Sequence, residues 1–431
     1  MTRPRFIDQR TATLIVIANM VGTGVFTTLG LQAVGVADGA ALLLLWLLGG
    51  LIALCGALAY AELAAALPRS GGEYHFVSRI YHPLLGQLAG WVSLTVGFAA
   101  PVALAAIAMG HYAATLVPVR AEVVAVVVTL LITGVHAFDV QLGRQVQVIA
   151  TWLKILVILV FCALGLTQPI VSGALAVTPT TATWEAIWSA PFGVALIYVA
   201  YAYSGWNAAA YVADEVADPA RAVPRALLLG TLVVTVLYLL LNLTFLRTVA
   251  HADLAGRVEV GALSAETILG PWGGHLMSLV LMLLLVSTIS AMVLAGPRVL
   301  ERIGEDLAIL RPLAARNRRG APTRAVLLQQ GLALLLILTG SFEGVLSFAG
   351  FTLTLFAMLT VAGAMRLRRL EPDLPRPFRI PWYPLPPALF LSAGLVSLIL
   401  LARERPLPVL LACGLLALGW LIVRRAHPAP R

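Results

Sequence analysis

Two short stretches place polar groups and helix-breaking glycines inside strongly apolar surroundings. The stretch "NMVGTGVF" puts Gly22 and Gly24 in the first apolar run, and "YAYSGWNAAAYVADE" puts Ser204, Gly205 and Asn207 at a comparable place in the sixth. Where a helix unwinds within a membrane, its freed N–H and C=O groups must be buried or must coordinate a ligand. The N–H groups that start a half-helix suit an anion, and unwound carbonyls suit a cation. The pair therefore predicts a site for a molecule that carries both charges.

A third stretch, "TWLKILVILVF", contains Lys154, the only lysine among 29 basic residues. A lysine ammonium is a compact charge with three donors and can lose its proton on burial, whereas the arginine guanidinium stays charged. We therefore expect Lys154 to be a buried, titratable cation. The alternative is that its side chain snorkels to the inner interface. About nine residues, or about 13 Å of helix, separate it from Gln145, which is a long reach for lysine.

The elements that must position these residues are membrane helices. The chain is 60% hydrophobic and 11% charged, whereas soluble proteins are about 45–50% apolar and about 25% charged. Apolar stretches of about 20 residues, long enough to cross a hydrocarbon core about 30 Å thick, recur along its whole length. We predict an all-α integral membrane protein with twelve transmembrane helices, at residues 11–34, 40–66, 84–117, 121–138, 145–167, 187–215, 223–247, 274–297, 323–341, 343–365, 382–402 and 406–423.

The arginines predict the orientation of these helices. With the N-terminus inside, 23 of the 28 arginines fall in inner segments and five fall in outer loops. Because Lys and Arg concentrate in cytoplasmic loops, both termini should be cytoplasmic. The formal charge of +9 is then a sign of topology, and we expect no nucleic-acid partner.

Several kinds of chemistry have no support in the sequence. It contains no Walker A loop, no metal-spaced His/Cys cluster and no G-x-S-x-G elbow. We therefore expect neither an enzyme nor a pump driven by ATP, with no metal and no cofactor. Cys55, Cys162 and Cys413 all fall within predicted helices, so they outline no extracellular disulfide framework.

The positions of the two glycine-containing breaks favour transport. They fall in the first and sixth predicted helices, each the first helix of a five-helix half, and paired interruptions point to an inverted repeat with a central site. The alternative is that these small residues merely allow close helix packing.

The sequence resembles the amino acid, polyamine and organocation superfamily, specifically its bacterial amino acid permeases related to the L-type amino acid transporters. The resemblance lies in "GTGVF", "AELAAALPRSGGEYHFV", "AYSGWNAAAYVADEVADPARAVPRAL", "SAMVLAGPR" and the long stretch from "LTGSFEGVLSF" to "PWYPLPP". It implies a LeuT-type fold with a five-plus-five inverted repeat. Residues 1–167 would form the first repeat, with helix 1 broken near 22–25, and residues 168–380 the second, with helix 6 broken near 203–207. Residues 381–431 would add two helices and a cytoplasmic tail.

The resemblance also implies roles for residues at the breaks. The N–H groups around Thr23 and Gly24 would bind a substrate carboxylate, and its α-amino group would meet carbonyls near Met20, Tyr201 and Ser204. Tyr201 occupies the family's gating position and would close over the substrate from outside. The complete expected substrate site is Met20, Gly22, Thr23, Gly24, Val25, Tyr201, Tyr203, Ser204, Gly205 and Asn207.

A coupling role for Lys154 follows from the same resemblance. In sodium-coupled members of the fold a cation bridges the unwound first helix and the eighth, and in several sodium-independent members a helix-five lysine takes its place. The stretch "VQVIATWLKIL" matches that lysine's surroundings. Lys154 would bond helix-one carbonyls near Met20 and Gly22, and Ser287, Thr288 and Ser290 of helix eight are the candidates to complete the site. Proton symport and exchange both remain open.

The expected function is sodium-independent secondary transport of neutral amino acids by alternating access. A charge at membrane depth costs upwards of about 2.5 kcal/mol, so an acid should meet a cationic substrate, and none is evident among the expected lining residues. The alternatives are polyamine or nucleobase transport, and an embedded binding protein or enzyme without translocation. The partners would be the amino acid, the lipid bilayer and, for symport, protons. Animal L-type transporters join a heavy chain through a cysteine in the loop after helix three, and the corresponding loop here, "VPVRAE", contains none, so the resemblance implies no disulfide-linked heavy chain. We place the protein in a bacterial inner membrane.

Overall fold

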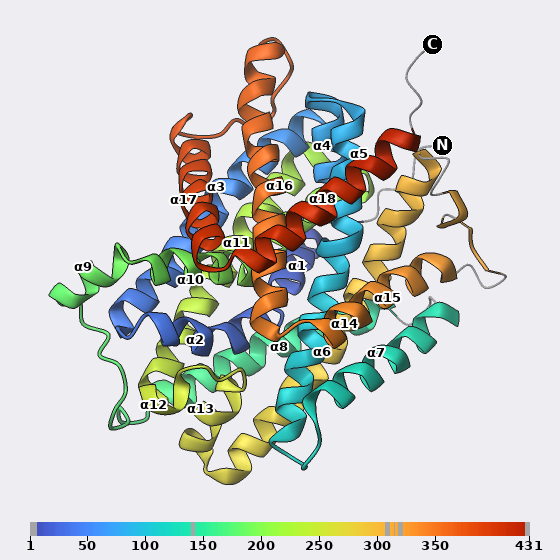
Figure 1. The fold of residues 1–431 in the computed structure, drawn as a ribbon. Coiled ribbons are helices and arrows are strands. Elements are labelled where there is room, and N and C mark those ends of the chain that lie inside the picture. Colours follow the sequence, from blue (N-terminus) through green and yellow to red (C-terminus); the bar gives the residue numbers. More distant parts are fainter. Residues whose placement is uncertain (1–6, 139–142, 307–310, 314, 318–321, 427–431) are drawn as a thin grey trace.

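The computed structural model describes residues 7–138, 143–306, 311–313, 315–317 and 322–426. Within these ranges every element is a helix, apart from one isolated parallel bridge between Ile7 and Val216 (Figure 1). Some of the arginines used to predict the orientation, including Arg3, Arg5 and Arg431, lie outside the described residues.

Eight helical stretches of the described residues are long and apolar enough to cross a membrane, and one pair bent by 70° makes a ninth. The eight are Gln9–Gly35 (α1 and α2), Gly39–Ala66 (α3), Pro83–Ala114 (α5, η1 and α6), Pro219–Thr248 (α11), Pro271–Pro297 in α14, Phe342–Leu370 (α16), Leu385–Glu404 (α17) and Pro406–Arg425 in α18; the pair is Thr181–Ile187 (α9) with Ala190–Ala202 (α10). The predicted fourth, fifth and ninth spans coincide with α7 (Ala121–Phe138), α8 (Gly143–Leu166) and α15 (Thr323–Thr339), whose described apolar parts are shorter. An all-helical chain with many membrane-length helices is confirmed, and the total of twelve spans stays a prediction.

The first predicted span is two helices rather than one. α1 (Gln9–Met20) begins at Asp8, whose side chain accepts from the Thr11 N–H, and α2 begins at Gly24 and ends at Gly35. Residues 21–23 between them leave the helical hydrogen-bond pattern, since the Gly22 N–H donates back to the Met20 carbonyl at 2.8 Å.

The sixth predicted span is also interrupted. α10 ends at Ala202, residues 203–207 form turns, and η2 (Ala208–Glu215) continues as a 3-10 helix with Val212 outside helical geometry. A 3-10 segment in mid-chain often marks a hinge or a sequence under strain. The second half of this span therefore differs from an ordinary α-helix.

Two features near the third predicted span were not predicted. A short amphipathic helix, α4 (Glu73–Ile80), lies between α3 and α5. The span itself consists of α5 (Pro83–Val92), a π-helical turn η1 (Ser93–Phe98) and α6 (Ala99–Ala114). The loop before α14 (Pro271–Asp306) adds α12 (His251–Leu254) and α13 (Val260–Leu269).

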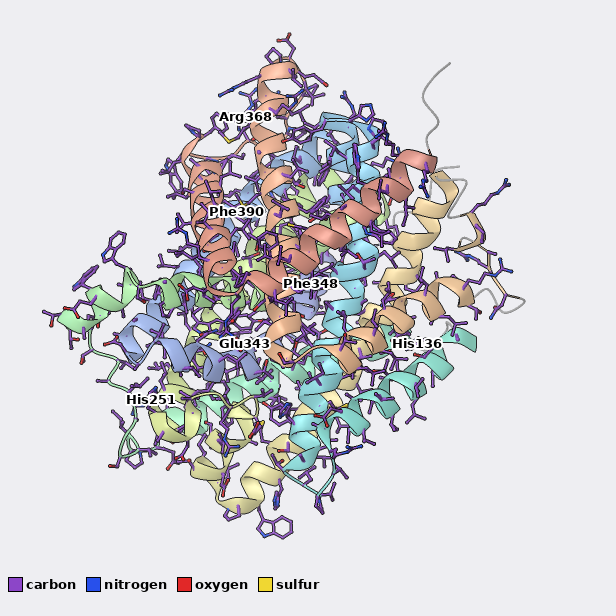
Figure 2. All side chains as sticks on the ribbon, in the orientation of Figure 1. His136, His251, Glu343, Phe348, Arg368 and Phe390 are labelled. Carbon is purple, nitrogen blue, oxygen red and sulfur yellow. The ribbon has the colours of Figure 1, made fainter. Side chains whose placement is uncertain are left out.

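Helix packing brings the two interruptions to the centre of the molecule. α11 packs along α3 and α1, and α10 packs against α2, α16 and α17. At one end of α16, the Glu62 carboxylate on α3 accepts from Arg368 Nε at 2.7 Å and from the Ile380 N–H at 2.8 Å. At the other end, Glu343 accepts from Arg405 at 2.7 Å, and Figure 2 shows Glu343 and Arg368 far apart along this helix. Both ends of α16 are thus tied to neighbouring segments.

Candidate functional site

The two interrupted segments touch each other through glycine. A Cβ atom built on Gly24 would lie 2.5 Å from the Ala202 Cα, and one built on Gly205 would lie 2.8 Å from the Asn19 carbonyl carbon. Gly205 also has a φ of +97°, a conformation that residues with a side chain rarely adopt. Glycine at both positions therefore allows the backbones of the two interruptions to meet.

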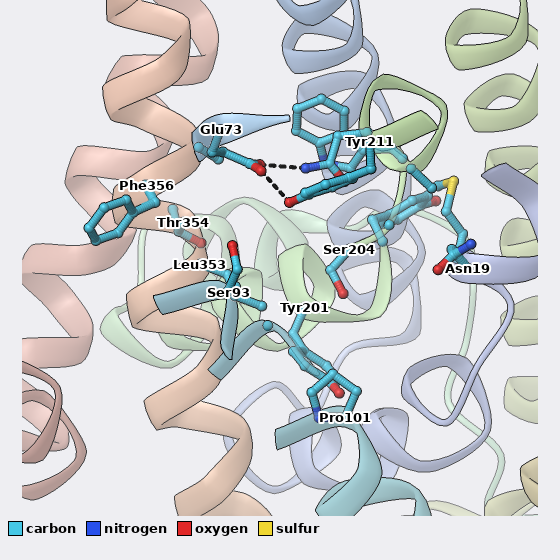
Figure 3. Close-up of a pocket in the computed structure, with 18 of the residues that line it drawn as sticks. Asn19, Glu73, Ser93, Pro101, Tyr201, Ser204, Tyr211, Leu353, Thr354 and Phe356 are labelled. Atoms are coloured by element: carbon cyan, nitrogen blue, oxygen red, sulfur yellow. Dashed lines mark hydrogen bonds between the residues drawn. The ribbon is translucent and has the colours of Figure 1, made fainter. Parts of the chain in front are cut away.

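A cavity of about 570 Å³ opens beside this contact (Figure 3). Nine of the ten residues expected in the substrate site line it: Met20, Gly22, Thr23, Gly24, Tyr201, Tyr203, Ser204, Gly205 and Asn207. Val25 does not, because its side chain is fully buried in the core one residue beyond the break. The cavity runs from Tyr201 and Pro101 at one end to Glu73 at the other. Its lining there includes the exposed Arg69, so it reaches the surface at that end.

The first break presents free N–H groups. Among the described residues, the N–H groups of Thr23, Gly24 and Val25 have no hydrogen-bond partner. They lie at the N-terminus of α2, where the helix dipole places a partial positive charge. This end of the cavity is suited to a carboxylate.

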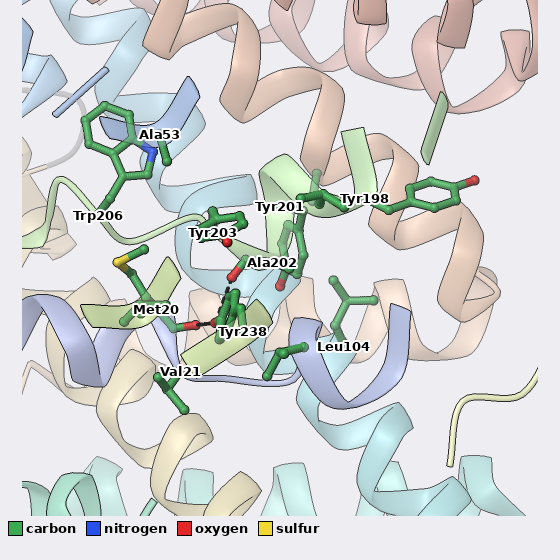
Figure 4. Close-up of a cluster of buried hydrophobic side chains, with 14 of the residues drawn as sticks. Met20, Val21, Ala53, Leu104, Tyr198, Tyr201, Ala202, Tyr203, Trp206 and Tyr238 are labelled. Carbon is green, nitrogen blue, oxygen red and sulfur yellow. Dashed lines mark hydrogen bonds between the residues drawn. The ribbon is translucent and has the colours of Figure 1, made fainter. Parts of the chain in front are cut away.

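The Met20 carbonyl beside the first break is already in use. The Met20 carbonyl accepts from the Gly22 N–H at 2.8 Å and from the Tyr238 hydroxyl of α11 at 2.5 Å. The same hydroxyl lies 3.0 Å from the Ala202 carbonyl at the end of α10 (Figure 4). A hydroxyl has one proton to donate, so Tyr238 serves one carbonyl at a time and joins the two breaks. An ammonium group would therefore meet an occupied Met20 carbonyl, which differs from the expected contact.

Free carbonyls are found elsewhere. Among the described residues, the carbonyls of Asn19, Tyr203 and Ser204 accept no hydrogen bond. All three residues line the cavity, and Asn19 lies against Gly205. These acceptors are suited to a cationic group.

Lys154 is buried against the first break. Its side chain is 2% exposed, and Nζ donates to the Val21 carbonyl at 3.1 Å and to Thr288 Oγ1 of α14 at 2.9 Å. The Val21 carbonyl lies between the expected carbonyls of Met20 and Gly22. The Lys154 amine is buried in the protein and does not snorkel toward a membrane interface. On α14 the contact is made by Thr288, whereas Ser290 Oγ lies 2.7 Å from His136 Nε2 of α7.

The two tyrosines of the expected site face different surroundings. Tyr201 is 6% exposed and lies near Pro101 at the closed end of the cavity, opposite Glu73. Tyr203 donates its hydroxyl to the Trp46 carbonyl at 3.0 Å and packs its ring against Trp46 and Tyr238. The Tyr203 side chain is thus part of the core, and the free group that it offers is its carbonyl.

Sequence reasoning missed an acid in the cavity wall. Glu73, the first residue of α4, is 8% exposed and accepts from Tyr60 Oη at 2.7 Å, from Asn207 Nδ2 at 2.5 Å and from the Tyr211 hydroxyl. The expectation that no acid lines the pocket was therefore wrong. The signal in the sequence was the glycine pair before the acid in "GGEY". Gly72 has a φ of +53°, and a Cβ there would lie 2.7 Å from the Tyr211 ring, so glycine at this position lets Glu73 approach the cavity.

The chain is similar to known membrane transporters over most of its length. The family model described as amino acid permease matches residues 7–420. The chain is 28% identical to the large neutral amino acids transporter small subunit 2 of Mus musculus over 383 residues, which cover 85% of this chain and 71% of that protein. It is 26% identical to the serine/threonine exchanger SteT of Bacillus subtilis (strain 168) over 392 residues, covering 89% and 88%. It is also 26% identical to the cystine/glutamate transporter of Homo sapiens over 386 residues, covering 87% and 76%.

Proposed function

Because the chain belongs to the amino acid permease family, we propose that it is a sodium-independent secondary transporter that moves zwitterionic amino acids by alternating access. Its relatives are transporters rather than enzymes, and the chain is a multi-pass membrane protein. The observation that carries the proposal is the contact between two broken helices, with free N–H groups at the start of α2 and free carbonyls at Asn19, Tyr203 and Ser204.

The substrate backbone fits between these two sets of groups. Its carboxylate accepts from the N–H groups of Thr23, Gly24 and Val25, and its ammonium donates to the carbonyls of Asn19 or Ser204. The side chain then extends into the rest of the cavity, whose volume exceeds what the backbone needs. Gly24 and Gly205 act by keeping the two backbones close, and Tyr201 acts as the gate at the closed end.

Lys154 supports the sodium-independent part of the proposal. Its ammonium joins a carbonyl of the first break to a hydroxyl of α14. A fixed cation in this position stabilises the unwound backbone without a bound ion. The same amine can also release its proton, so symport with a proton and exchange of one amino acid for another both fit the arrangement.

The wider architecture of the proposal is the five-plus-five repeat expected from the sequence, with both termini cytoplasmic in a bacterial inner membrane. Its support is that the breaks fall in corresponding helices of residues 1–167 and 168–380. The cavity reaches the surface beside Arg69 and is closed at Tyr201, which is the one-sided opening required of a state in an alternating-access cycle. We expect no disulfide-linked heavy chain.

Uptake into proteoliposomes tests the proposal. Labelled leucine, serine, glutamine and lysine are offered in sodium chloride and in choline chloride, with empty liposomes as the blank. We expect uptake of at least one amino acid in both salts, faster when the vesicles are preloaded if exchange operates and faster with an inward proton gradient if symport operates. Loss of uptake in choline would contradict sodium independence, and binding without uptake would favour the embedded-receptor alternative.

Polyamine transport is the second candidate, because the carboxylate of Glu73 in the cavity wall is suited to an ammonium group. Competition by putrescine against a labelled amino acid separates the two. We expect weak competition, since a polyamine has no carboxylate for the free N–H groups of the first break.

A further inference from the structure

Glu73 brings a negative charge to the part of the cavity nearest the second break. It lies one hydrogen bond from Asn207, within the turn that interrupts the sixth span. We propose that Glu73 determines charge selectivity: it admits amino acids with neutral or cationic side chains and excludes those with anionic ones. This inference rests on the proposed function, since it concerns the substrates of that same cavity.

The Glu73 carboxylate is surrounded by hydrogen-bond donors. Tyr60 from α3, Asn207 from the turn and Tyr211 from η2 all donate to it, and none of these groups is a base. Hydrogen bonds to a charged acceptor are stronger than those between neutral groups. Glu73 also occupies the first turn of α4, where a negative charge is favourable.

Two charged neighbours of Glu73 are engaged with other groups, and a third, Arg69, is exposed at the same end of the cavity. Arg79 on α4 pairs with Glu371 at 2.8 Å, and Asp214 of η2 bonds to Ser70. Within the described ranges no cation forms an ion pair with Glu73. Its charge is therefore balanced by hydrogen bonds alone in that part of the chain and is available to act on a substrate.

One acceptor position of the carboxylate remains for a ligand. Oε1 accepts from Tyr60 and Asn207, and Oε2 accepts from Tyr211. An ionised carboxylate has about four acceptor positions, so Oε2 can accept one more donor from the cavity side. A side-chain amide or ammonium supplies that donor. A side-chain carboxylate has no proton to offer and repels the charge of Glu73.

The pair glutamate and glutamine tests this selectivity with one change of charge at nearly constant shape. In proteoliposomes, each is used to compete against the labelled amino acid with the fastest uptake, in wild type, in Glu73→Gln and in Glu266→Gln. Glu266 is an exposed acid on α13 and serves as the matched control. We expect glutamine to compete about tenfold more strongly than glutamate in wild type and in the control, and the two to compete within about threefold of each other in Glu73→Gln. Competition by lysine should weaken in Glu73→Gln.

The outcomes separate this inference from the proposed function. If wild type takes up no amino acid, the proposed function fails. If wild type takes up amino acids but glutamate competes as strongly as glutamine, the selectivity inference is overturned while transport stands. The wild-type protein alone gives this result. An unchanged ratio in Glu73→Gln would also overturn it. Should that variant fail to yield folded protein, Glu73→Asp keeps the charge and must retain the preference for glutamine, whereas equal competition there would count against the inference.

Discussion

The two broken helices at the centre of the molecule are supported by opposite charges. The first break is short, spanning residues 21–23, and the cation Lys154 bonds its Val21 carbonyl. The second is a five-residue turn followed by a 3-10 helix, and the anion Glu73 bonds its Asn207 amide. The N–H groups of Thr23, Gly24 and Val25 are free at the first break, and the carbonyls of Tyr203 and Ser204 are free at the second. The difference is that the cation holds the first break through its backbone, whereas the anion holds the second through a side chain, Asn207 Nδ2.

Removing the backbone contact should have the largest effect on both breaks. In Gly24→Ala the new methyl would overlap Ala202 backbone atoms, and in Gly205→Ala it would overlap Asn19 in a conformation unfavourable to alanine. Backbone atoms cannot move aside as side chains do, so we expect uptake to fall at least about 100-fold in each, with a destabilisation of about 1–3 kcal/mol. Gly134→Ala, which has open space around it, is the control. Normal uptake by either variant would show that the backbone contact between the two breaks is not needed for transport.

Loss of the cation should affect the first break more than any other single side-chain change. Lys154→Ala removes two hydrogen bonds and leaves the Val21 carbonyl and Thr288 hydroxyl without that donor. Hydrogen bonds to charged groups contribute about 1.5–3 kcal/mol each, so we expect uptake to fall by about 100-fold or more. Thr288→Val keeps the ammonium and should lose less. Replacement of the exposed Arg120 by alanine should leave uptake unchanged, and equal losses for Lys154→Ala and Thr288→Val would show that charge is not the cause.

The hydroxyl that joins the breaks should have an intermediate effect. Tyr238→Phe keeps the ring packed against Trp46 and Tyr203 but removes the donor to the Met20 and Ala202 carbonyls. We expect a loss of about 0.5–1.5 kcal/mol, seen as an up to about tenfold rise in KM. Tyr81→Phe is the control, because the half-buried Tyr81 also donates to a backbone carbonyl but away from the breaks, that of Leu359 on α16. Equal effects in the two variants would mean that the Tyr238 hydroxyl contributes no more than an ordinary tyrosine hydrogen bond elsewhere in the protein.

The smallest predicted effect is a pH dependence of stability that comes from His75 on α4, the helix that carries Glu73. Burial, with help from Arg69 and Arg79, lowers the pKa of His75 on α4 to about 4. A histidine with a folded-state pKa below its unfolded value of about 6.5 contributes stability above that value and loses it as pH falls toward 4. Between pH 7 and pH 5 the Tm of the purified protein should therefore fall more in wild type than in His75→Gln, by about 2–4 °C. Parallel pH dependences in the two proteins would rule this contribution out.

Much of this geometry could be predicted from the sequence, because it depends on local chemistry. Glycines beside polar residues in an apolar run indicate where a helix breaks, and a lone lysine in such a run indicates a buried cation. The partner of Lys154 on α14 could not be chosen in the same way. Successive residues of a helix point about 100° apart, so Thr288 rather than Ser287 or Ser290 depends on how α14 is rotated in the packed structure.

The contacts that join distant segments lay beyond sequence reasoning. Tyr238 reaches both breaks because α11 packs between them, and its spacing from either break carries no such signal. Glu73 enters the cavity because Gly72 adopts a positive φ and allows α4 to approach Tyr211. Its position changes the expectation for the substrate, since an acid does line the cavity.

The most direct test of the account asks whether both charges of an amino acid are needed at once. The amino acid with the fastest uptake is compared, as a competitor, with its decarboxylated amine and with its deaminated acid. We predict that each analogue competes at least about 100-fold more weakly than the amino acid, because each leaves one of the two breaks without its charged partner. If either analogue competes as well as the amino acid itself, the two breaks do not form a shared zwitterion site.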